Sequence, residues 1–421
     1  MEHILPRFFN HSRKIAVIAK DIYVFDENNK KYLDGSSNVL NVNLGYSQLE
    51  IINEIHKQSD KLIYMHNSIM LSEAQEKLSD QLIELLGMKN FSCYFCSSGS
   101  EAIEAALRIS QLVKKNKTKK HASFNNSYHG STMGALSISG SVVRNDFIDT
   151  LFDTTFFEYP FCFSCEKYKH CDYSCLNEIE KEISKENYYS LTFDPVGSNA
   201  LGSNIMKSQY LSRLSEICRK SQTLLILDEI SASIGRTGYN FSFQSYDDFK
   251  PDILCISKGL GVGYANIAAV IVNNDVIDNL KNDWNILGNT YNGHPIACAA
   301  ASKAIEIIKR ENLINSNREL GIKINNWFEI IRQNPIVLDV QGIGLFFTIR
   351  FKDKNGTLNA KKVNELNKKN GLLMLDSSIV RENQYYSHLT FTPPFISKEN
   401  EIKEMIEIIQ KSIFELSLEV L

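Results

Sequence analysis

Two residues of this sequence, Lys258 and Asp228, could act together in covalent chemistry. Lys258 follows Asp228 by 30 residues, and each comes at the end of a short apolar stretch. A lysine amine can form an imine with an aldehyde cofactor, and a buried carboxylate can keep a pyridine nitrogen protonated so that the ring takes up electrons. The pair therefore suggests pyridoxal 5'-phosphate (PLP). Taken singly, the lysine also fits a solvated turn and the aspartate a helix cap.

A segment rich in serine and glycine could hold the phosphate of such a cofactor. Residues 96–102 end an expected strand and open an expected helix, so free backbone N–H groups and the positive end of the helix dipole would face an anion. Gly99 would allow close approach, and the hydroxyls of Ser98 and Ser100 would add donors. Ordinary N-capping by serine explains the same residues and is common.

Two further loops offer contacts to the same cofactor. Tyr128, in the loop Ser127–Gly134, could lie flat on a pyridine ring while Gly130 keeps the loop close. Thr290, in a turn-rich segment before a helix, could offer its hydroxyl to a phosphate. A packing role for the tyrosine and a plain capping loop around Thr290 stay open as alternatives.

Short apolar stretches alternate with helical stretches along most of the chain, which is the α/β pattern. We expect a mostly parallel central sheet with helices on both faces and with the chemistry in the loops after its strands. An amphipathic helix from about 398 to 418 predicts part of a second, smaller α/β unit, its apolar stripe facing the core. The expected strands of the large sheet are 91–96, 121–124, 191–196, 224–228, 253–257 and 268–272.

The predicted domain order follows from these elements. Residues 1–60 form an N-terminal segment of the small domain, 61–310 the large PLP-binding domain, and 311–421 the C-terminal part of the small α/β domain. A cysteine-rich insertion at about 160–176 interrupts the large domain. The length and the hydrophobic content of 43% allow a large core.

Composition also restricts the partners and the compartment. A net charge of -3, without a basic block interleaved with aromatics, argues against nucleic acid. No apolar run is long enough for a membrane span or an export signal, so we expect no membrane association. Nine cysteines in such a chain indicate reduced thiols and a cytoplasmic location.

These blocks resemble the class III aminotransferases, the ornithine/4-aminobutyrate type within PLP fold type I. The resemblance runs from the hairpin at Tyr23 to the twin prolines Pro393 and Pro394, and six blocks come in the family's order. They are Ser98–Ala102, Tyr128–Gly130, Asp228-Glu229, Gly235–Gly238, Ser257–Leu260, and Thr290 with Gly293–Pro295.

The resemblance implies a set of roles and partners. Lys258 forms the internal aldimine, Asp228 pairs with the pyridinium nitrogen, Tyr128 stacks on the ring, and Gly99 and Ser100 hold the phosphate. Thr290 is similar to the residue that reaches the phosphate of the neighbouring subunit, which implies a homodimer with shared active sites. The implied reaction transfers an amino group from an amino donor to a 2-oxo acid acceptor.

Three departures from the family pattern concern the substrate. Ser231 stands where a glutamine normally bonds the ring hydroxyl, and Asp194-Pro195 replaces the usual Glu-Pro. Thr390 stands where an arginine commonly precedes the twin prolines. Because that arginine is absent, the residue that binds a substrate carboxylate is open, and an uncommon amino substrate is expected. The candidates by position are Arg144, Arg236 and Arg381, of which Arg236 better fits a structural bond.

Four cysteines, Cys162, Cys165, Cys171 and Cys175, lie close together in the sequence with His170 between them. One C-x2-C pair and one C-x3-C pair could gather four thiolates around zinc or an iron–sulfur unit. Reduced thiols in a surface insertion explain the same pattern. The metal therefore stays unassigned.

Two other functions use the same residues differently. A PLP enzyme could instead catalyse racemization, epimerization, an aminomutase reaction or decarboxylation, because one carbanion serves all of them. Tyr128–Thr132 also resembles the block of the family's amino-acid epimerases. A non-catalytic binding protein on the same fold is disfavoured by Lys258 and Asp228.

Overall fold

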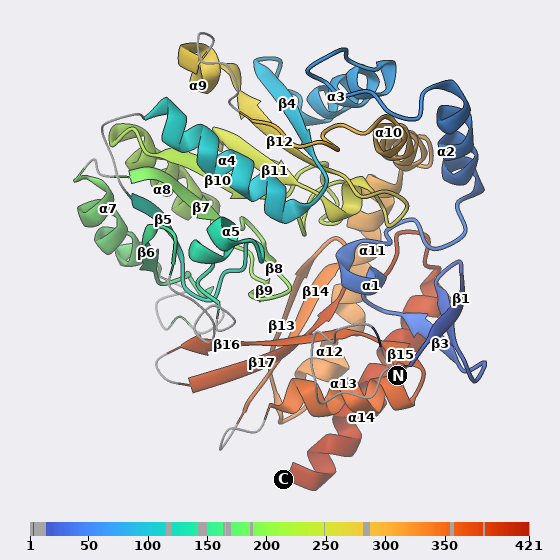
Figure 1. Ribbon diagram of the computed structural model, residues 1–421. Coiled ribbons are helices and arrows are strands. Elements are labelled where there is room, and N and C mark those ends of the chain that lie inside the picture. The colour runs from blue at the N-terminus through green and yellow to red at the C-terminus, as the bar shows by residue number, and fades with distance from the viewer. Residues whose placement is uncertain are drawn as a thin grey trace.

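The computed structural model describes residue 3 and residues 14–420, apart from 115–119, 142–149, 163–164, 166–169, 186–187, 248, 281–286, 354–357 and 382–383. The chain forms a large sheet covered by helices and, below it in Figure 1, a smaller unit that contains the C-terminal elements. No helix of the described part is long and apolar enough to cross a membrane.

A central seven-stranded sheet has the order β4-β12-β11-β10-β7-β5-β6. Only β12 runs against its neighbours, so the prediction of a mostly parallel sheet is confirmed. The strands are β4 (Phe91–Cys96), β5 (Lys120–Phe124), β6 (Asp153–Phe157), β7 (Tyr188–Phe193), β10 (Leu224–Asp228), β11 (Ile253–Ile256) and β12 (Ala268–Asn273).

Both faces of this sheet are buried, because successive residues of a strand point to opposite sides. In β10, Ile226 belongs to the apolar cluster that includes Ile103 of helix α4 (Gly99–Val113), whereas Leu225 and Leu227 belong to the larger cluster on the other side. Figure 1 shows α4 crossing one face of the sheet. Such strands read as continuous apolar runs, which is why the sequence revealed them.

The remaining helices of the large unit surround the sheet. Helix α10 packs against both α2 and α3 near one edge, at the upper right of Figure 1. Helix α8 lies against β10 and α7. The helices are α2 (Leu49–Lys61), α3 (Glu73–Leu86), α5 (Met133–Ser137), α7 (Asn177–Ile183), α8 (Ser208–Lys220), α9 (Asn274–Ile277) and α10 (Pro295–Arg310).

The C-terminal unit is an antiparallel sheet of order β13-β14-β17-β16, with helices packed on it. The apolar stripe of α14 is buried, as predicted: Ile402, Met405, Ile406, Ile409 and Ile413 all lie in the core. The elements are α11 (Leu313–Trp327), α12 (Glu329–Arg332), β13 (Val337–Ile343), β14 (Phe346–Phe351), α13 (Asn359–Lys369), β16 (Leu375–Arg381), β17 (Gln384–Phe391) and α14 (Glu399–Val420).

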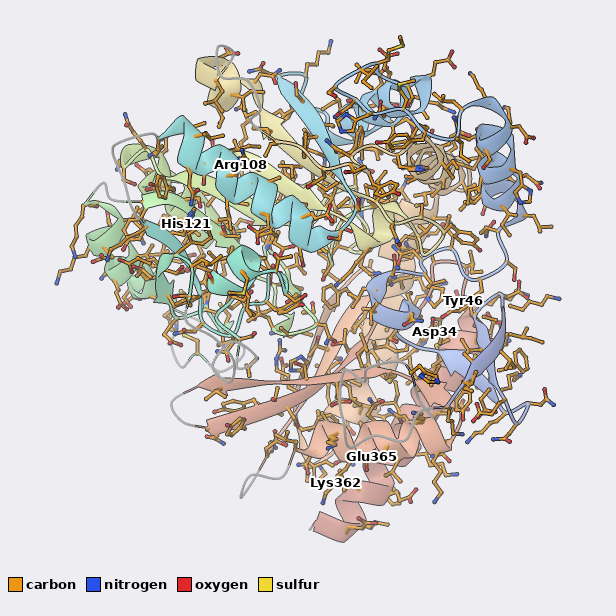
Figure 2. The ribbon with its side chains drawn as sticks, viewed as in Figure 1. Asp34, Tyr46, Arg108, His121, Lys362 and Glu365 are labelled. Atoms are coloured by element: carbon orange, nitrogen blue, oxygen red, sulfur yellow. The ribbon has the colours of Figure 1, made fainter. Side chains whose placement is uncertain are left out.

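The first strands of the chain complete this lower unit. β1 (Ala16–Lys20), β2 (Tyr23–Asp26) and β3 (Lys31–Asp34) form a sheet with β15 (Leu372–Leu373), and β3 runs parallel to β15. Figure 2 shows Asp34 beside Tyr46, whose hydroxyl donates a hydrogen bond to the Asp34 carboxylate at 2.7 Å. The domain limits at 60 and 310 stay a prediction.

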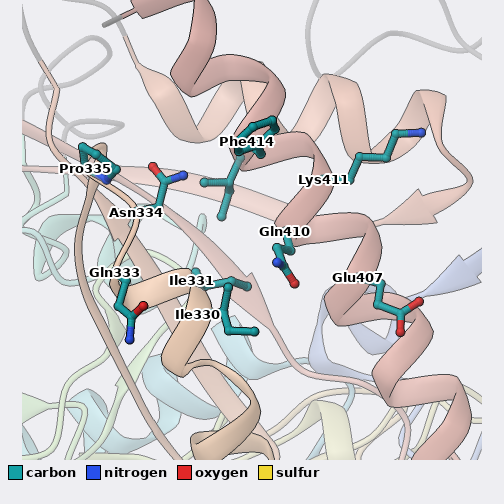
Figure 3. A pocket seen from close by; sticks show the side chains of 10 residues that line it. Ile330, Ile331, Gln333, Asn334, Pro335, Glu407, Gln410, Lys411 and Phe414 are labelled. Carbon is teal, nitrogen blue, oxygen red and sulfur yellow. The ribbon is translucent and has the colours of Figure 1, made fainter.

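A surface groove of about 560 Å³ lies between α12 and α14 in the C-terminal unit (Figure 3). It contains none of the residues predicted to take part in catalysis. Its lining residues are Ile330, Ile331, Gln333, Asn334, Pro335, Glu407, Gln410, Lys411, Ile413 and Phe414.

Candidate active site

The polar residues of the candidate site follow the carboxyl ends of neighbouring parallel strands, which meet at one edge of the sheet. Asp228 is the last residue of β10, and Lys258 comes two residues after β11. Asp194 comes directly after β7, because that strand ends at Phe193 and not at Val196 as predicted. His129 lies in the loop after β5. Four separate segments therefore converge on one place.

Lys258 opens a short 3-10 turn, η4 (Lys258–Leu260), in a left-handed backbone conformation with φ of 40°. A non-glycine residue holds that conformation only where its surroundings enforce it. The Nζ of Lys258 donates a hydrogen bond to the Oγ of Ser231 at 2.8 Å. Burial lowers the pKa of Lys258, against the opposing charges of Asp228 and Asp194. The amine is therefore easier to deprotonate than an exposed lysine.

A buried cluster of His129, Asp194 and Asp228 backs this amine. The Nδ1 of His129 lies 2.8 Å from Asp228 Oδ2 and 3.6 Å from Asp194 Oδ1. Burial by itself lowers the pKa of His129. The charge of Asp194, together with the hydrogen bond and the charge of Asp228, outweighs burial, so the pKa of His129 is raised. Burial, and then the charge of Asp228, raise the pKa of Asp194 to about 8. The charges of these buried side chains therefore act directly on one another.

We expect Asp194→Asn to weaken the pH dependence of stability between about pH 4 and pH 8. In the folded chain Asp194 keeps its proton up to about pH 8, whereas its ordinary value is 3.8. Folding therefore takes up a proton in this window, and stability falls as the pH rises, by at most about 1.4 kcal/mol per pH unit for one group. Urea unfolding of the cofactor-free protein at several pH values measures the slope. An unchanged slope in the variant would refute the assignment.

The start of α4 offers two unused backbone donors next to the cluster. Ser98 is the N-cap, and its Oγ accepts a hydrogen bond from the N–H of Glu101 at 3.3 Å, so the capping alternative describes its side chain. Within the described residues, the N–H groups of Gly99 and Ser100 have no hydrogen-bond partner. Such N–H groups at a helix N-terminus attract anions. A Cβ at Gly99 would lie 2.9 Å from the Ile230 side chain, so this glycine also permits close packing.

The loop that carries Tyr128 is held against the same helix end. The N–H of Ser131 donates to Ser100 Oγ at 3.2 Å, and a Cβ at Gly130, which has φ of 142°, would lie 2.6 Å from that oxygen. Tyr128 itself is half-buried, and its ring stacks on no other ring of the described part. Gly130 therefore lets the loop lie close to Ser100 at the start of α4.

Thr290 lies on an exposed turn, away from these contacts. Its backbone carbonyl accepts a hydrogen bond from the hydroxyl of Tyr64 at 2.6 Å, and its side chain is exposed. Within the described residues, no hydrogen bond joins this side chain to the Lys258 turn or to the start of α4. The single chain therefore does not bring Thr290 together with the other predicted site residues.

Comparisons with known proteins decide the family. The family profile described as Aminotransferase class-III matches residues 10–413. This chain belongs to the class III aminotransferases. An uncharacterized aminotransferase of Bacillus subtilis, YodT, is 30% identical over 425 residues, which cover 95% of this chain and 94% of that protein. Taurine–pyruvate aminotransferase of Bilophila wadsworthia is 29% identical over 440 residues, which cover 97% of this chain and 94% of that protein.

The solved structure of a Bacillus anthracis aminotransferase has the same fold as this class III aminotransferase. Its TM-score is 0.90 at 28% sequence identity, and the match covers 99% of this chain and 96% of that one. The predicted enzyme class and PLP fold type I are thus confirmed. These relatives give no support to a racemase, epimerase, aminomutase or decarboxylase.

The arginines of this aminotransferase are placed as follows. Arg236 is buried and holds two segments together: it donates to the carbonyls of Leu345 and Pro393 and to the side-chain oxygens of Ser37 and Asn43. Burial lowers its pKa to about 9. Because these four acceptors occupy the Nη1 and Nη2 groups, this guanidinium does not serve to bind a substrate carboxylate. Arg144 and the side chain of Arg381 lie outside the described residues.

We expect Arg236→Ala to lower the free energy of unfolding by about 3–5 kcal/mol, because it leaves four buried acceptors without this donor. Urea denaturation of the cofactor-free protein measures the loss. Arg318→Ala is the matched control, because Arg318 is exposed and donates to the carbonyl of Gly238 in the same loop. An equal loss in both variants would contradict the structural role of Arg236.

A second buried arginine, Arg350 on β14, was not predicted. Its Nη2 donates to the Ser203 carbonyl at 2.6 Å, and its Nη1 lies 3.3 Å from an Asp339 oxygen. Thr390, which replaces the family arginine, pairs with Thr348 across the sheet, two residues from Arg350 along β14. Arg350 thus ties β14 to β9 (Gly202–Ser203).

Proposed function

We propose that this class III aminotransferase holds PLP through Lys258 and transfers an amino group from an amino acid or amine to a 2-oxo acid. The observation that carries the proposal is the placement of Lys258, with its lowered pKa, beside the buried carboxylate of Asp228 at the end of parallel strands. An amine with a low pKa is the nucleophile and proton carrier that such chemistry requires.

The residues present fit this cofactor. The N–H groups of Gly99 and Ser100 at the start of α4 suit a phosphate, and the carboxylate of Asp228 suits a protonated ring nitrogen. Ser98, Tyr128 and Ser231 border these groups. We assign phosphate binding to Gly99 and Ser100, with Ser98 as the helix cap. The ring contact of Tyr128 is carried over from the family.

Each of the site residues has a distinct task in the proposed mechanism. Bound PLP supplies an aldehyde that takes the amino group and a ring that accepts an electron pair. Lys258 would remove the α-proton of the substrate with its free amine and pass this proton to the cofactor, while Ser231 orients the amine through their hydrogen bond. Asp228 stabilises a proton on the ring nitrogen. His129 fixes the carboxylate of Asp228 by its own hydrogen bond.

The functional unit in this proposal is a homodimer with shared active sites. An exposed apolar set of side chains, here called the Tyr64 surface, includes Tyr64 and Tyr291, which contact each other at the Thr290 turn, and supports a subunit contact. Its exposed large side chains are Ile63, Tyr64, Ile69, Met70, Leu71 and Tyr291. Thr290 would then reach the partner's phosphate. Light scattering is expected to give twice the mass of one chain.

The location proposed is the cytoplasm, where all nine cysteines would stay reduced. None of them forms a disulfide in the structure. The pattern fits a reducing compartment. Nucleic acid and membranes are not expected partners.

The experiment that tests the proposed function identifies both the attachment site and the co-substrate. Borohydride reduction followed by peptide mapping should place the pyridoxyl label on Lys258. A panel of amines and amino acids, each assayed with pyruvate and with 2-oxoglutarate, should show turnover that requires the 2-oxo acid. Ser231 and Thr390 lead us to expect an uncommon donor, so efficient turnover of ornithine or 4-aminobutyrate would refute that expectation. A label elsewhere would refute the site.

A further inference from the structure

Four cysteines of the insertion line one cavity away from the candidate active site. Cys162, Cys165, Cys171 and Cys175 border a space of about 450 Å³, together with residues from the end of β6, from α7 and from the start of α8. The sequence places these cysteines within 14 residues, and the fold turns all four toward the same volume. The other five cysteines of the chain do not line it.

Each pair of cysteines is associated with a backbone turn. The N–H of Cys165 donates to the carbonyl of Cys162 at 3.3 Å, which closes the C-x2-C turn. In the second pair, Asp172 accepts a hydrogen bond from the N–H of Ser174 at 3.0 Å, and the chain then enters the 3-10 turn η2 (Ser174–Leu176) that includes Cys175. Paired cysteines on short turns are the usual ligand arrangement of structural zinc sites.

A basic side chain borders the same cavity. Lys207, directly before α8, lines it together with the four cysteines. A positive charge there would offset part of the charge of four thiolates.

We propose that Cys162, Cys165, Cys171 and Cys175 bind one zinc ion in tetrahedral coordination. Four S–H bonds break, four protons pass to solvent, and four Zn–S bonds form, without any change of oxidation state. Soft thiolate ligands select zinc over magnesium or calcium. No residue of the candidate active site takes part, so the site is structural and closed to substrate.

Binding has to draw the sulfur atoms together. Among the described residues, His129, Asp194 and Asp228 form a group of three side chains whose potential metal-ligand atoms lie within 4.8 Å of one another. No three cysteines of the described part lie that close. All four cysteines border the cavity, so the movement that zinc binding requires would be directed into this space.

Zinc binding would also stabilise the segment just before Cys162, which contacts the candidate active site. Tyr159, which lines the same cavity, donates its hydroxyl hydrogen to the backbone carbonyl of Asp194 at 2.8 Å. Asn204 donates to the carbonyl of Pro160 at 3.1 Å. A zinc ion that holds Cys162 in place therefore steadies the residues directly behind the His129, Asp194 and Asp228 cluster.

Metal analysis of the full-length protein tests the proposal. Protein purified without oxygen from cells supplied with zinc should contain about one zinc ion per chain. Cys162→Ser and Cys175→Ser should each reduce the zinc content to below about a tenth. Cys93→Ser and His170→Ala are matched controls, because Cys93 lies outside the cavity and His170 is not among the four ligands, and both should keep full zinc.

A second measurement does not depend on variants that fold poorly. Treating the unmodified protein with a strong zinc chelator should lower its Tm, and adding zinc back should restore it, while PLP binding at Lys258 stays measurable. Protein without zinc would overturn the proposal, as would iron with inorganic sulfide, or a mass showing disulfides among the four cysteines. Zinc that survives in Cys162→Ser would also overturn it.

Discussion

Lys258→Ala is expected to lower kcat by roughly three to four orders of magnitude, because the variant loses the amine that moves the α-proton. Neighbouring side chains do not replace it, since Ser231 is a neutral hydroxyl and the carboxylate of Asp228 is engaged by His129. Steady-state assays with a donor that the wild type accepts measure the loss. Covalent retention of PLP after borohydride treatment should disappear in parallel.

The matched control for this variant is Lys303→Ala. Lys303 is a partly buried lysine of α10 that pairs with Glu306 and takes no part in the candidate site. It should keep both activity and label. Circular dichroism must show that Lys258→Ala is folded. A folded Lys258→Ala protein with full activity would end the proposed mechanism.

Asp228→Asn is expected to lower kcat by roughly a hundredfold to a thousandfold. The amide keeps the shape of the side chain but loses the negative charge that favours a protonated ring nitrogen, and it disturbs the hydrogen bond to His129. The pH dependence of the rate should change as well, because Asp194 then lacks the neighbouring charge that raises its pKa. Stopped-flow and steady-state kinetics across the pH range measure both effects.

Asp252→Asn separates this role from the general effect of removing a buried carboxylate. Asp252 precedes β11 and accepts a hydrogen bond from the N–H of Leu225 at 2.8 Å, so it lies at the opposite end of the same two strands. Burial raises the pKa of Asp252. The control should lose stability but keep its kcat. Equal losses of kcat in both variants would contradict a specific role for Asp228.

The sequence predicted the fold correctly, and it indicated two candidate site residues, because both depend on local pattern. Strands buried on two faces are continuous apolar runs, and a residue after such a strand belongs to the edge where ligands bind. The residue types of Lys258 and Asp228 and their positions after apolar runs therefore made them candidates. The reversed direction of β12 leaves no such signal, because an apolar run reads the same in either direction.

Contacts between distant side chains could not be predicted in this way. His129 stands in a block that was noticed for its tyrosine and glycine, yet its partner is 99 positions away and only the fold brings them together. Ser231 stays a prediction for the ring hydroxyl, and its hydrogen bond from Lys258 was not predicted. A buried histidine after a strand, with two aspartates at the ends of neighbouring strands, is the signal that could have indicated the cluster.

The pairing of β3 with β15 has a consequence for how the protein is made. The ribosome releases the first strands early, but β3 can pair with β15 only after residue 372 has been made. The hydroxyl of Ser37 likewise donates to the carbonyl of Thr392, which is synthesised 355 positions later. The lower unit thus remains unfinished until nearly the whole polypeptide has emerged. Such long-range closure slows folding and leaves apolar strands open to aggregation, so nascent chains should depend on chaperones.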